Sequence, residues 1–263
     1  MAILSVDLAT NRYRDIGVAV LIADEGLVSV EFVEAVASGL SGRPRVEDLS
    51  HWLAELASSY VADVIFMDGP QGWKDPSNGH VHARSCEREL VTPGKTGLPG
   101  LVKPGSWTRM AEFSIELFDA LGDCGFQRLH DADELRPGRK LVIESFPTSA
   151  WRSLGLKKLS SKGRTSTSQL ASCTAALLSL IRLILTRQPS HDELQALVAG
   201  LAGLPLLGHN LIETKLFGSK PVRLDGTWRE GFIVNPDFVL AEIVLFVKTV
   251  WLNISRSMCR NNF

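Results

Sequence analysis

Three apolar runs of this sequence end on an acidic residue. They are residues 3–7 (ILSVD), 64–68 (VIFMD) and 141–144 (LVIE). Short apolar runs of this kind are typical of buried β-strands, where a carboxylate is costly unless it has a partner or binds a metal. The acids Asp7, Asp68 and Glu144 could therefore converge on one metal ion, and this possibility is the strongest indication of function in the sequence.

The pattern along the chain predicts strands and helices in a definite order. Residues 2–8, 16–23 and 27–35 are expected to form an antiparallel meander, because turn signals separate these β-rich runs. The further expected elements are a helix at 46–60, strands at 61–67 and 140–144, and helices at 107–121, 149–154, 169–187, 191–201 and 236–252. This order is the layout of a ribonuclease-H-like α/β fold, a mixed sheet of a three-strand antiparallel meander plus parallel strands, flanked by helices.

In such a sheet the first and fourth strands are neighbours. Asp7 and Asp68 would then face each other across one strand spacing, about 5 Å. Two carboxylates this close repel each other unless a divalent cation neutralises them. Oxygen ligands of this kind suit Mg²⁺ or Mn²⁺, and such ions can activate water for attack on a phosphodiester.

Composition fits an ordinary globular protein. The chain has 263 residues, of which 45% are hydrophobic and 22% charged, so it can bury a sizeable core. We expect one domain over residues 1–263, with a C-terminal helical extension at about 236–263. With 28 basic and 29 acidic residues, the protein as a whole is not an electrostatic nucleic-acid binder. Scattered cysteines, with no signal segment and no membrane span, favour a cytoplasmic location.

Several short motifs resemble, in order and spacing, those of a known family. They are residues 6–9 (VDLA), 67–70 (MDGP), 84–88 (RSCER), 142–147 (VIESFP), 191–197 (HDELQAL) and 226–233 (GTWREGFI). Together they are similar to the family of predicted ribonuclease-H-like nucleases, which is catalogued as a domain of unknown function. The resemblance implies a metal-dependent nuclease that hydrolyses phosphodiester bonds of DNA or RNA.

The same resemblance implies a set of acidic ligands for Mg²⁺ or Mn²⁺. Asp7 would bridge the metal ions, Asp68 would face it, and Glu144 would act as a third ligand or orient the water. Asp192, at the start of a late helix, would complete the site. The family usually has a second aspartate where this chain has Gln195, so a one-metal site or an inactive variant remains open.

Basic residues in two irregular segments are candidates for binding phosphates. The long Gly- and Pro-rich loop 73–107 and the polar connector 156–168 supply them: Arg84, Arg88, Lys95, Lys103, Lys158 and Lys162. An alternative for Glu144 is a buried ion pair with Arg84 or Arg88. Three tryptophans either stack on bases or, as we favour, pack in the core: Trp107, Trp151 and Trp228.

Two other functions remain open. The fold could serve as a catalytically inactive binding module, which the glutamine at position 195 favours. The meander with an acid on its first strand also resembles actin-like and sugar-kinase phosphotransferases. Those proteins need a glycine-rich phosphate turn, and residues 9–12 (ATNR) contain no glycine. The sequence leaves the oligomeric state undetermined, with a homodimer among the possibilities.

Overall fold

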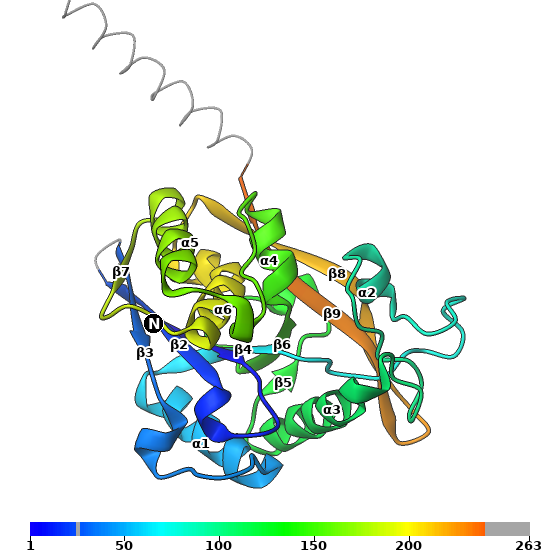
Figure 1. Cartoon of the computed structure of the whole chain (residues 1–263). Coiled ribbons are helices and arrows are strands. Elements are labelled where there is room, and N and C mark those ends of the chain that lie inside the picture. The colour runs from blue at the N-terminus through cyan, green and yellow to red at the C-terminus, as the bar shows by residue number, and fades with distance from the viewer. Residues whose placement is uncertain (25–26, 240–263) are drawn as a thin grey trace, which may run out of the picture.

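The computed structural model describes residues 1–24 and 27–239. A nine-stranded mixed sheet forms the centre of this described part (Figure 1). Its strands are β1 (Ala2–Asp7), β2 (Gly17–Asp24), β3 (Leu27–Phe32), β4 (Ala62–Asp68), β5 (Gln127–Arg128), β6 (Leu141–Ser145), β7 (Leu183–Leu185), β8 (Ile212–Leu224) and β9 (Thr227–Phe238). The helices are α1 (Val46–Ser59), α2 (Ser85–Glu89), α3 (Thr108–Asp123), α4 (Pro147–Ser153), α5 (Thr167–Leu180) and α6 (His191–Gly200).

The strand order confirms the expected fold class. The sheet runs β7-β3-β2-β1-β4-β6-β9-β8, and β5 pairs with β6. Strands β1, β2 and β3 form the antiparallel meander, and β1, β4, β6 and β9 are parallel to one another. Because β1 and β4 are adjacent and parallel, their carboxyl ends lie at the same edge of the sheet.

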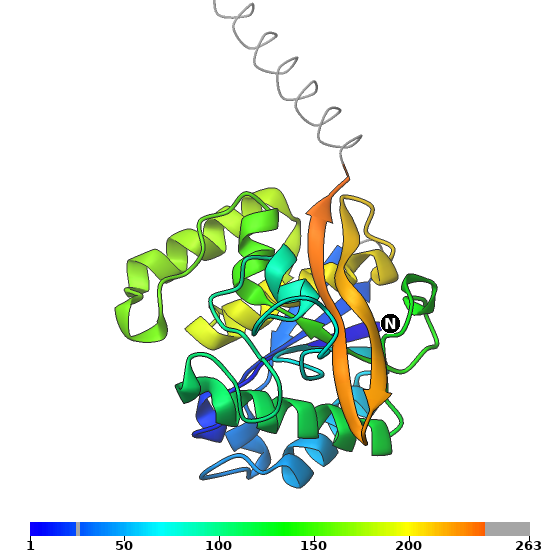
Figure 2. The same ribbon diagram turned by 90° about the vertical axis from the view of Figure 1, so that its right-hand side faces the viewer.

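Helices cover both faces of the sheet, in agreement with the alternation of apolar side chains along the strands. On one face, Ile3 and Phe66 belong to the core under α4, α5 and α6. On the other face, Leu4 and Met67 belong to the core above α1 and α3. Figures 1 and 2 show these two helical layers on opposite sides of the sheet. Both faces are buried, so the central strands are apolar at nearly every position.

Helix α6 lies directly on the meander because small residues stand where the two elements meet. A side-chain Cβ added to Gly200 would lie 2.6 Å from Cβ of Ser5 on β1. The Ser5 hydroxyl donates a buried hydrogen bond of 2.7 Å to the carbonyl of Ala196. These contacts hold the middle and the last residue of α6 against β1.

Several expected boundaries differ from the structure. The helix expected over 169–187 ends at Leu180, and residues 183–185 instead form β7, which extends the sheet beside β3. Residues 212–238 form the long β8–β9 hairpin, which is missing from the expected elements, and Figure 2 shows it crossing the molecule. Strand β9 continues to Phe238, where a helix from residue 236 was expected. The rest of that predicted helical extension, residues 240–263, lies outside the described residues. No helix within residues 1–24 and 27–239 is long and apolar enough to cross a bilayer.

Candidate functional site

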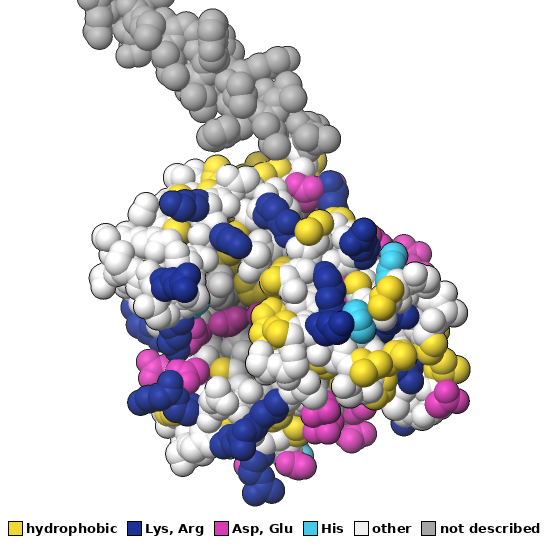
Figure 3. All heavy atoms as spheres, turned by 45° about the vertical axis from the view of Figure 1, so that its right-hand side comes forward, with side chains coloured by type: hydrophobic (Ala, Val, Ile, Leu, Met, Phe, Trp, Pro, Cys, Tyr) yellow, Lys and Arg dark blue, Asp and Glu magenta, His cyan; other side chains and the backbone are white. Residues whose placement is uncertain are grey.

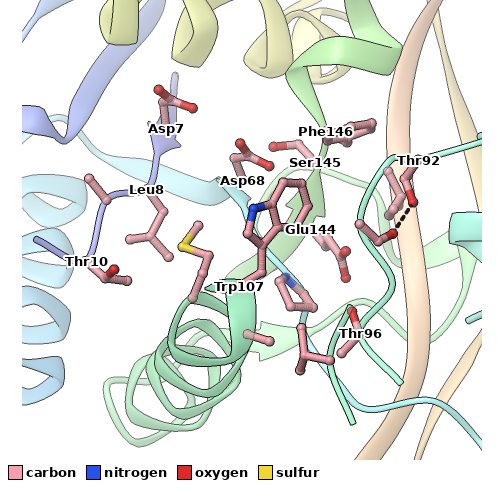
Figure 4. Close-up of a pocket in the computed structure, with 18 of the residues that line it drawn as sticks. Asp7, Leu8, Thr10, Asp68, Thr92, Thr96, Trp107, Glu144, Ser145 and Phe146 are labelled. Atoms are coloured by element: carbon pink, nitrogen blue, oxygen red, sulfur yellow. Dashed lines mark hydrogen bonds between the residues drawn. The ribbon is translucent and has the colours of Figure 1, made fainter. Parts of the chain in front are cut away.

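Asp7 and Asp68 end two adjacent parallel strands and point to the same side of the sheet. Val6 pairs with Met67, so the two aspartates follow one residue later in the same register. Each lies in the row that faces α6, because side chains alternate along a strand. Figure 4 shows both carboxyl groups turned into the same space, and both line one cavity. The structure therefore brings together the first two acids predicted from the sequence.

Burial and mutual repulsion disfavour the charged forms of this pair. Desolvation is the largest cause that raises the pKa of Asp7 well above its ordinary value, and the charges of Asp68 and Asp192 add to it. Desolvation also raises the pKa of Asp68 to about 7, with a contribution from the charge of Glu144. Near neutral pH the pair therefore either shares a proton or needs a cation.

Asp192 is the third acid near this pair. It is the second residue of α6, whose start is capped by Ser190 and Glu193 in a reciprocal pair of hydrogen bonds. Gly17 is the partner of Asp7 on β2, and a Cβ there would lie 2.2 Å from the backbone carbonyl of Asp192. Only glycine at this position lets the start of α6 approach Asp7, a requirement that sequence analysis missed.

The carboxylate of Asp192 already has two partners. Nδ1 of His191 lies 2.9 Å from Asp192 Oδ1, and Nζ of Lys162 donates to Asp192 Oδ2. The same Nζ also lies 2.9 Å from Oδ1 of Asp15. Lys162 is thus a cation held between two acids at one end of the site. Its positive charge offsets part of the rise in the pKa of Asp7.

Glu144 lines the same cavity as the other acids, but its carboxylate is turned away from Asp7 and Asp68, and the prediction that the three carboxylates converge on one ion is wrong. It pairs with Met67, one residue before Asp68, so it points to the opposite face of the sheet. Arg84 binds its carboxylate through Nη1 at 2.8 Å and Nη2 at 2.5 Å, and the amide of Gln71 donates at 2.9 Å. The alternative of a buried ion pair is therefore the one that the structure contains. Figure 4 shows Glu144 directed away from Asp68.

Ser145 occupies the place that Glu144 was expected to take. It is the partner of Asp68 on β6 and lies in the same row of side chains. Its side chain is 1% exposed, and its hydroxyl has no hydrogen-bond partner among the described residues. Figure 4 shows it directed towards Asp68. A buried hydroxyl without a partner is unusual. Its oxygen is a further possible ligand for a metal ion beside the two aspartates.

A buried network of acids holds the long loop after β4. Glu87 binds Arg84 Nε at 3.0 Å and accepts from the amide and hydroxyl of Thr96. Glu230, on β9, accepts from the amide of Ser85 at 2.7 Å and from Asn78 Nδ2 at 2.6 Å. The loop is therefore ordered by side chains rather than by regular structure. Sequence analysis missed this role, because these acids carry no local signal of what they bind.

The predicted phosphate-binding residues separate into three groups. Lys95 and Lys162 line the cavity that contains the aspartates. Arg84 is 2% exposed and engaged with acids, so a phosphate cannot reach it. The remaining three side chains are exposed but do not line the cavity: Arg88, Lys103 and Lys158. Three of the six candidates therefore line the cavity, and of these Arg84 is already bound by Glu87 and Glu144.

The cavity has a volume of about 530 Å³. Figure 3 shows a hollow in the surface with acidic side chains inside it and basic side chains nearby. Asp7, Asp68, Asp192 and Ser145 line its acidic end, and Trp107 lines its apolar end. Acids, a free hydroxyl and an aromatic ring therefore face one shared space.

The donor set at the acidic end fits a single hard cation better than a four-acid metal cluster. No group of three or more His, Cys, Asp and Glu side chains within the described ranges is arranged to hold a metal ion. The pair of Asp7 and Asp68, with the free oxygen of Ser145, offers oxygen ligands of the kind that Mg²⁺ and Mn²⁺ prefer. Gln195 plays no part there, because its Oε1 accepts a hydrogen bond of 2.7 Å from Trp151 Nε1.

Comparison with known proteins gives only distant matches. No protein-family model matches the chain, and no curated protein sequence matches it. Among solved structures, "Thermus thermophilus RuvC structure" aligns with a TM-score of 0.38 and 10% identity, over 80% of this chain and 98% of that one. "T. thermophilus RuvC in complex with Holliday junction substrate" gives 0.35 and 11%, over 80% and 97%. At this distance the activity of those proteins does not transfer to this chain.

Proposed function

We propose that this protein is a metal-dependent phosphodiesterase that acts on nucleic acid. The observation that carries the proposal is the adjacent pair of Asp7 and Asp68, whose carboxyl groups share one cavity and whose pKa values are both raised. Such perturbed acids in a cleft are typical of functional sites. Their repulsion at neutral pH is best relieved by a divalent cation, for which Asp7 and Asp68 would be the ligands.

Each side chain of the cavity has a defined part in this proposal. A bound divalent ion would supply charge neutralisation at the phosphate and a more acidic water. Asp7 and Asp68 hold negative charge at the ends of two rigid strands, so the ligand geometry is preorganised. Lys162 and Lys95 also line the cavity and would attract flanking phosphates of the strand. Ser145 offers its free hydroxyl to a water or to a substrate oxygen.

Cleavage assays with single substitutions test the proposal. Labelled single- and double-stranded DNA and RNA are incubated with Mn²⁺ or Mg²⁺ and with wild type, Asp7→Asn or Asp68→Asn. We expect each substitution to remove cleavage. Asp48→Asn, at an exposed surface acid, is the matched control and should cleave like wild type. Cleavage that survives both substitutions at the pair would refute the proposed site.

A second candidate function is a non-catalytic nucleic-acid-binding module. It is favoured because the two other acids of the cavity already have partners: Glu144 is bound by Arg84, and Asp192 is bound by Lys162 and His191. Calorimetric titration with Mg²⁺ and Mn²⁺ separates the two candidates. A module without a metal site should show no binding heat that is lost in Asp7→Asn, whereas the phosphodiesterase should show it.

A further inference from the structure

The cavity beside the aspartates has an apolar wall that a metal site alone does not require. At about 530 Å³, it lies in the range of sites that bind small molecules. Its apolar lining includes Leu8, Pro70, Val102, Trp107, Met110 and Phe146. Oxygen donors suffice to hold a hard cation, so this wall indicates that part of the substrate is itself flat or apolar.

Trp107 is the most informative side chain of this wall. It is 42% exposed, whereas Trp52, Trp73 and Trp151 are at most 8% exposed and Trp228 is half-buried. Tryptophan is costly to leave in water. A large indole that stands open in the cavity of the two aspartates is therefore better explained by a ligand than by packing. Figure 4 shows the ring among the side chains that line this cavity.

The indole is also held in place. Its six-membered ring lies against the backbone of Gly94, where an added Cβ would be 1.9 Å from Cζ3 of Trp107. The Thr92 hydroxyl donates to the carbonyl of Gly94 at 2.7 Å, and Lys95 Nζ donates to the carbonyl of Thr92 at 2.6 Å. Thr96 is anchored on the buried Glu87. The ring is thus preorganised by the same buried network that includes Glu144.

We propose that the cavity binds one unstacked nucleobase against Trp107, so that the substrate is single-stranded nucleic acid or an unpaired strand end. The proposal rests on the function proposed above and adds its substrate class. Bases are planar and stack on aromatic side chains with little sequence preference. In a duplex both faces of a base are covered by its neighbours, so a paired base cannot reach the ring without being extruded. The hydroxyls of Thr10 and Ser145 line the same cavity and can bond the sugar or the base edge.

Binding measurements with altered bases test this inference without relying on cleavage. Fluorescence anisotropy is measured without divalent ions, using labelled oligothymidylate, an abasic oligomer of equal length and a duplex, with oligouridylate as the RNA arm. We expect Trp107→Ala to raise the Kd for oligothymidylate roughly tenfold, and Trp107→Phe to retain most of the affinity. The abasic strand should bind wild type about as weakly as oligothymidylate binds Trp107→Ala.

Leu101→Ala is the matched control, because it removes an exposed apolar side chain (52%) of the same loop that does not line the cavity. Its Kd should equal that of wild type. Unchanged affinity in Trp107→Ala, equal binding of abasic and intact strands, or tighter binding of the duplex would each overturn the inference. The abasic comparison needs no variant and therefore does not depend on how Trp107→Ala folds.

The two proposals fail in different ways. If Asp7→Asn abolishes cleavage but Trp107→Ala leaves the Kd for oligothymidylate unchanged, the hydrolytic function stands and the base pocket is refuted. If binding depends on Trp107 and on the base, but no strand is cut with any metal, the base pocket is supported and hydrolysis is refuted.

Discussion

Replacing Asp68 by asparagine is expected to stabilise the metal-free protein at alkaline pH, although the same change should abolish cleavage. Burial, the largest cause, and the charge of Glu144 raise the pKa of Asp68 from 3.8 to about 7. Each pKa unit corresponds to about 1.4 kcal/mol, so the ionised side chain costs the fold at most about 4 kcal/mol. We expect a gain of about 1–3 kcal/mol, because a buried asparagine must find its own hydrogen bonds.

The pH dependence of stability follows from the direction of this shift. The pKa of Asp68 in the folded state lies above its ordinary value of 3.8, so the folded protein holds the proton more tightly than the unfolded chain. The stabilisation by this proton is fully present below the ordinary pKa and is lost as the pH rises through the folded pKa of about 7. Wild type should therefore lose stability between these values. Asp68→Asn should lose less.

Urea denaturation followed by tryptophan fluorescence measures the effect, with wild type and Asp68→Asn compared in EDTA at about pH 5 and about pH 8. Excess Mg²⁺ should then stabilise wild type by about 2.7 kcal/mol when its concentration is 100 times Kd, and should leave the variant unchanged. Asp48→Asn controls for the loss of a carboxylate at an exposed site. If Asp68→Asn is less stable than wild type in EDTA at the higher pH, or responds equally to Mg²⁺, the repulsive pair is not the basis of a metal site.

Three further substitutions probe how the site is assembled. Glu144→Gln should cost about 1–3 kcal/mol in urea, because it removes one of the two carboxylates that bind the buried Arg84, yet the folded variant should keep its Mg²⁺-dependent stabilisation. Gly17→Ala should cost about 1–3 kcal/mol and reduce cleavage, because its Cβ would meet the Asp192 backbone at 2.2 Å; Gly122→Ala, with nothing within 4 Å, should be neutral or slightly stabilising. Lys162→Met should lower several-fold the Mg²⁺ concentration needed for half-maximal stabilisation in a thermal-shift titration, because it removes a positive charge beside the acids.

Hydrophobic patterning was sufficient to predict the central strands and the proximity of two acids. The runs ending at Asp7 and Asp68 are apolar on both faces, as strands buried between two helical layers must be. Once these strands are neighbours and parallel, acids at their ends must meet. The short β7 was not predicted, because its partner β3 is distant in the chain and gives no local signal. The β8–β9 hairpin does carry a local signal, the Asp225-Gly226 turn between Leu224 and Thr227, which sequence analysis did not use.

The sequence by itself determined the fold class and the acidic pair, since both follow from short-range apolar patterns and from the order of elements. Only the tertiary structure decided on which face of the sheet the Glu144 side chain lies, because a register offset of one residue turns a strand side chain to the opposite face. It also decided that Ser145 stands beside Asp68, that Gly17 admits the start of α6, and that Trp107 opens into the cavity. These features depend on contacts between segments far apart in the chain, which the local pattern of residues does not encode.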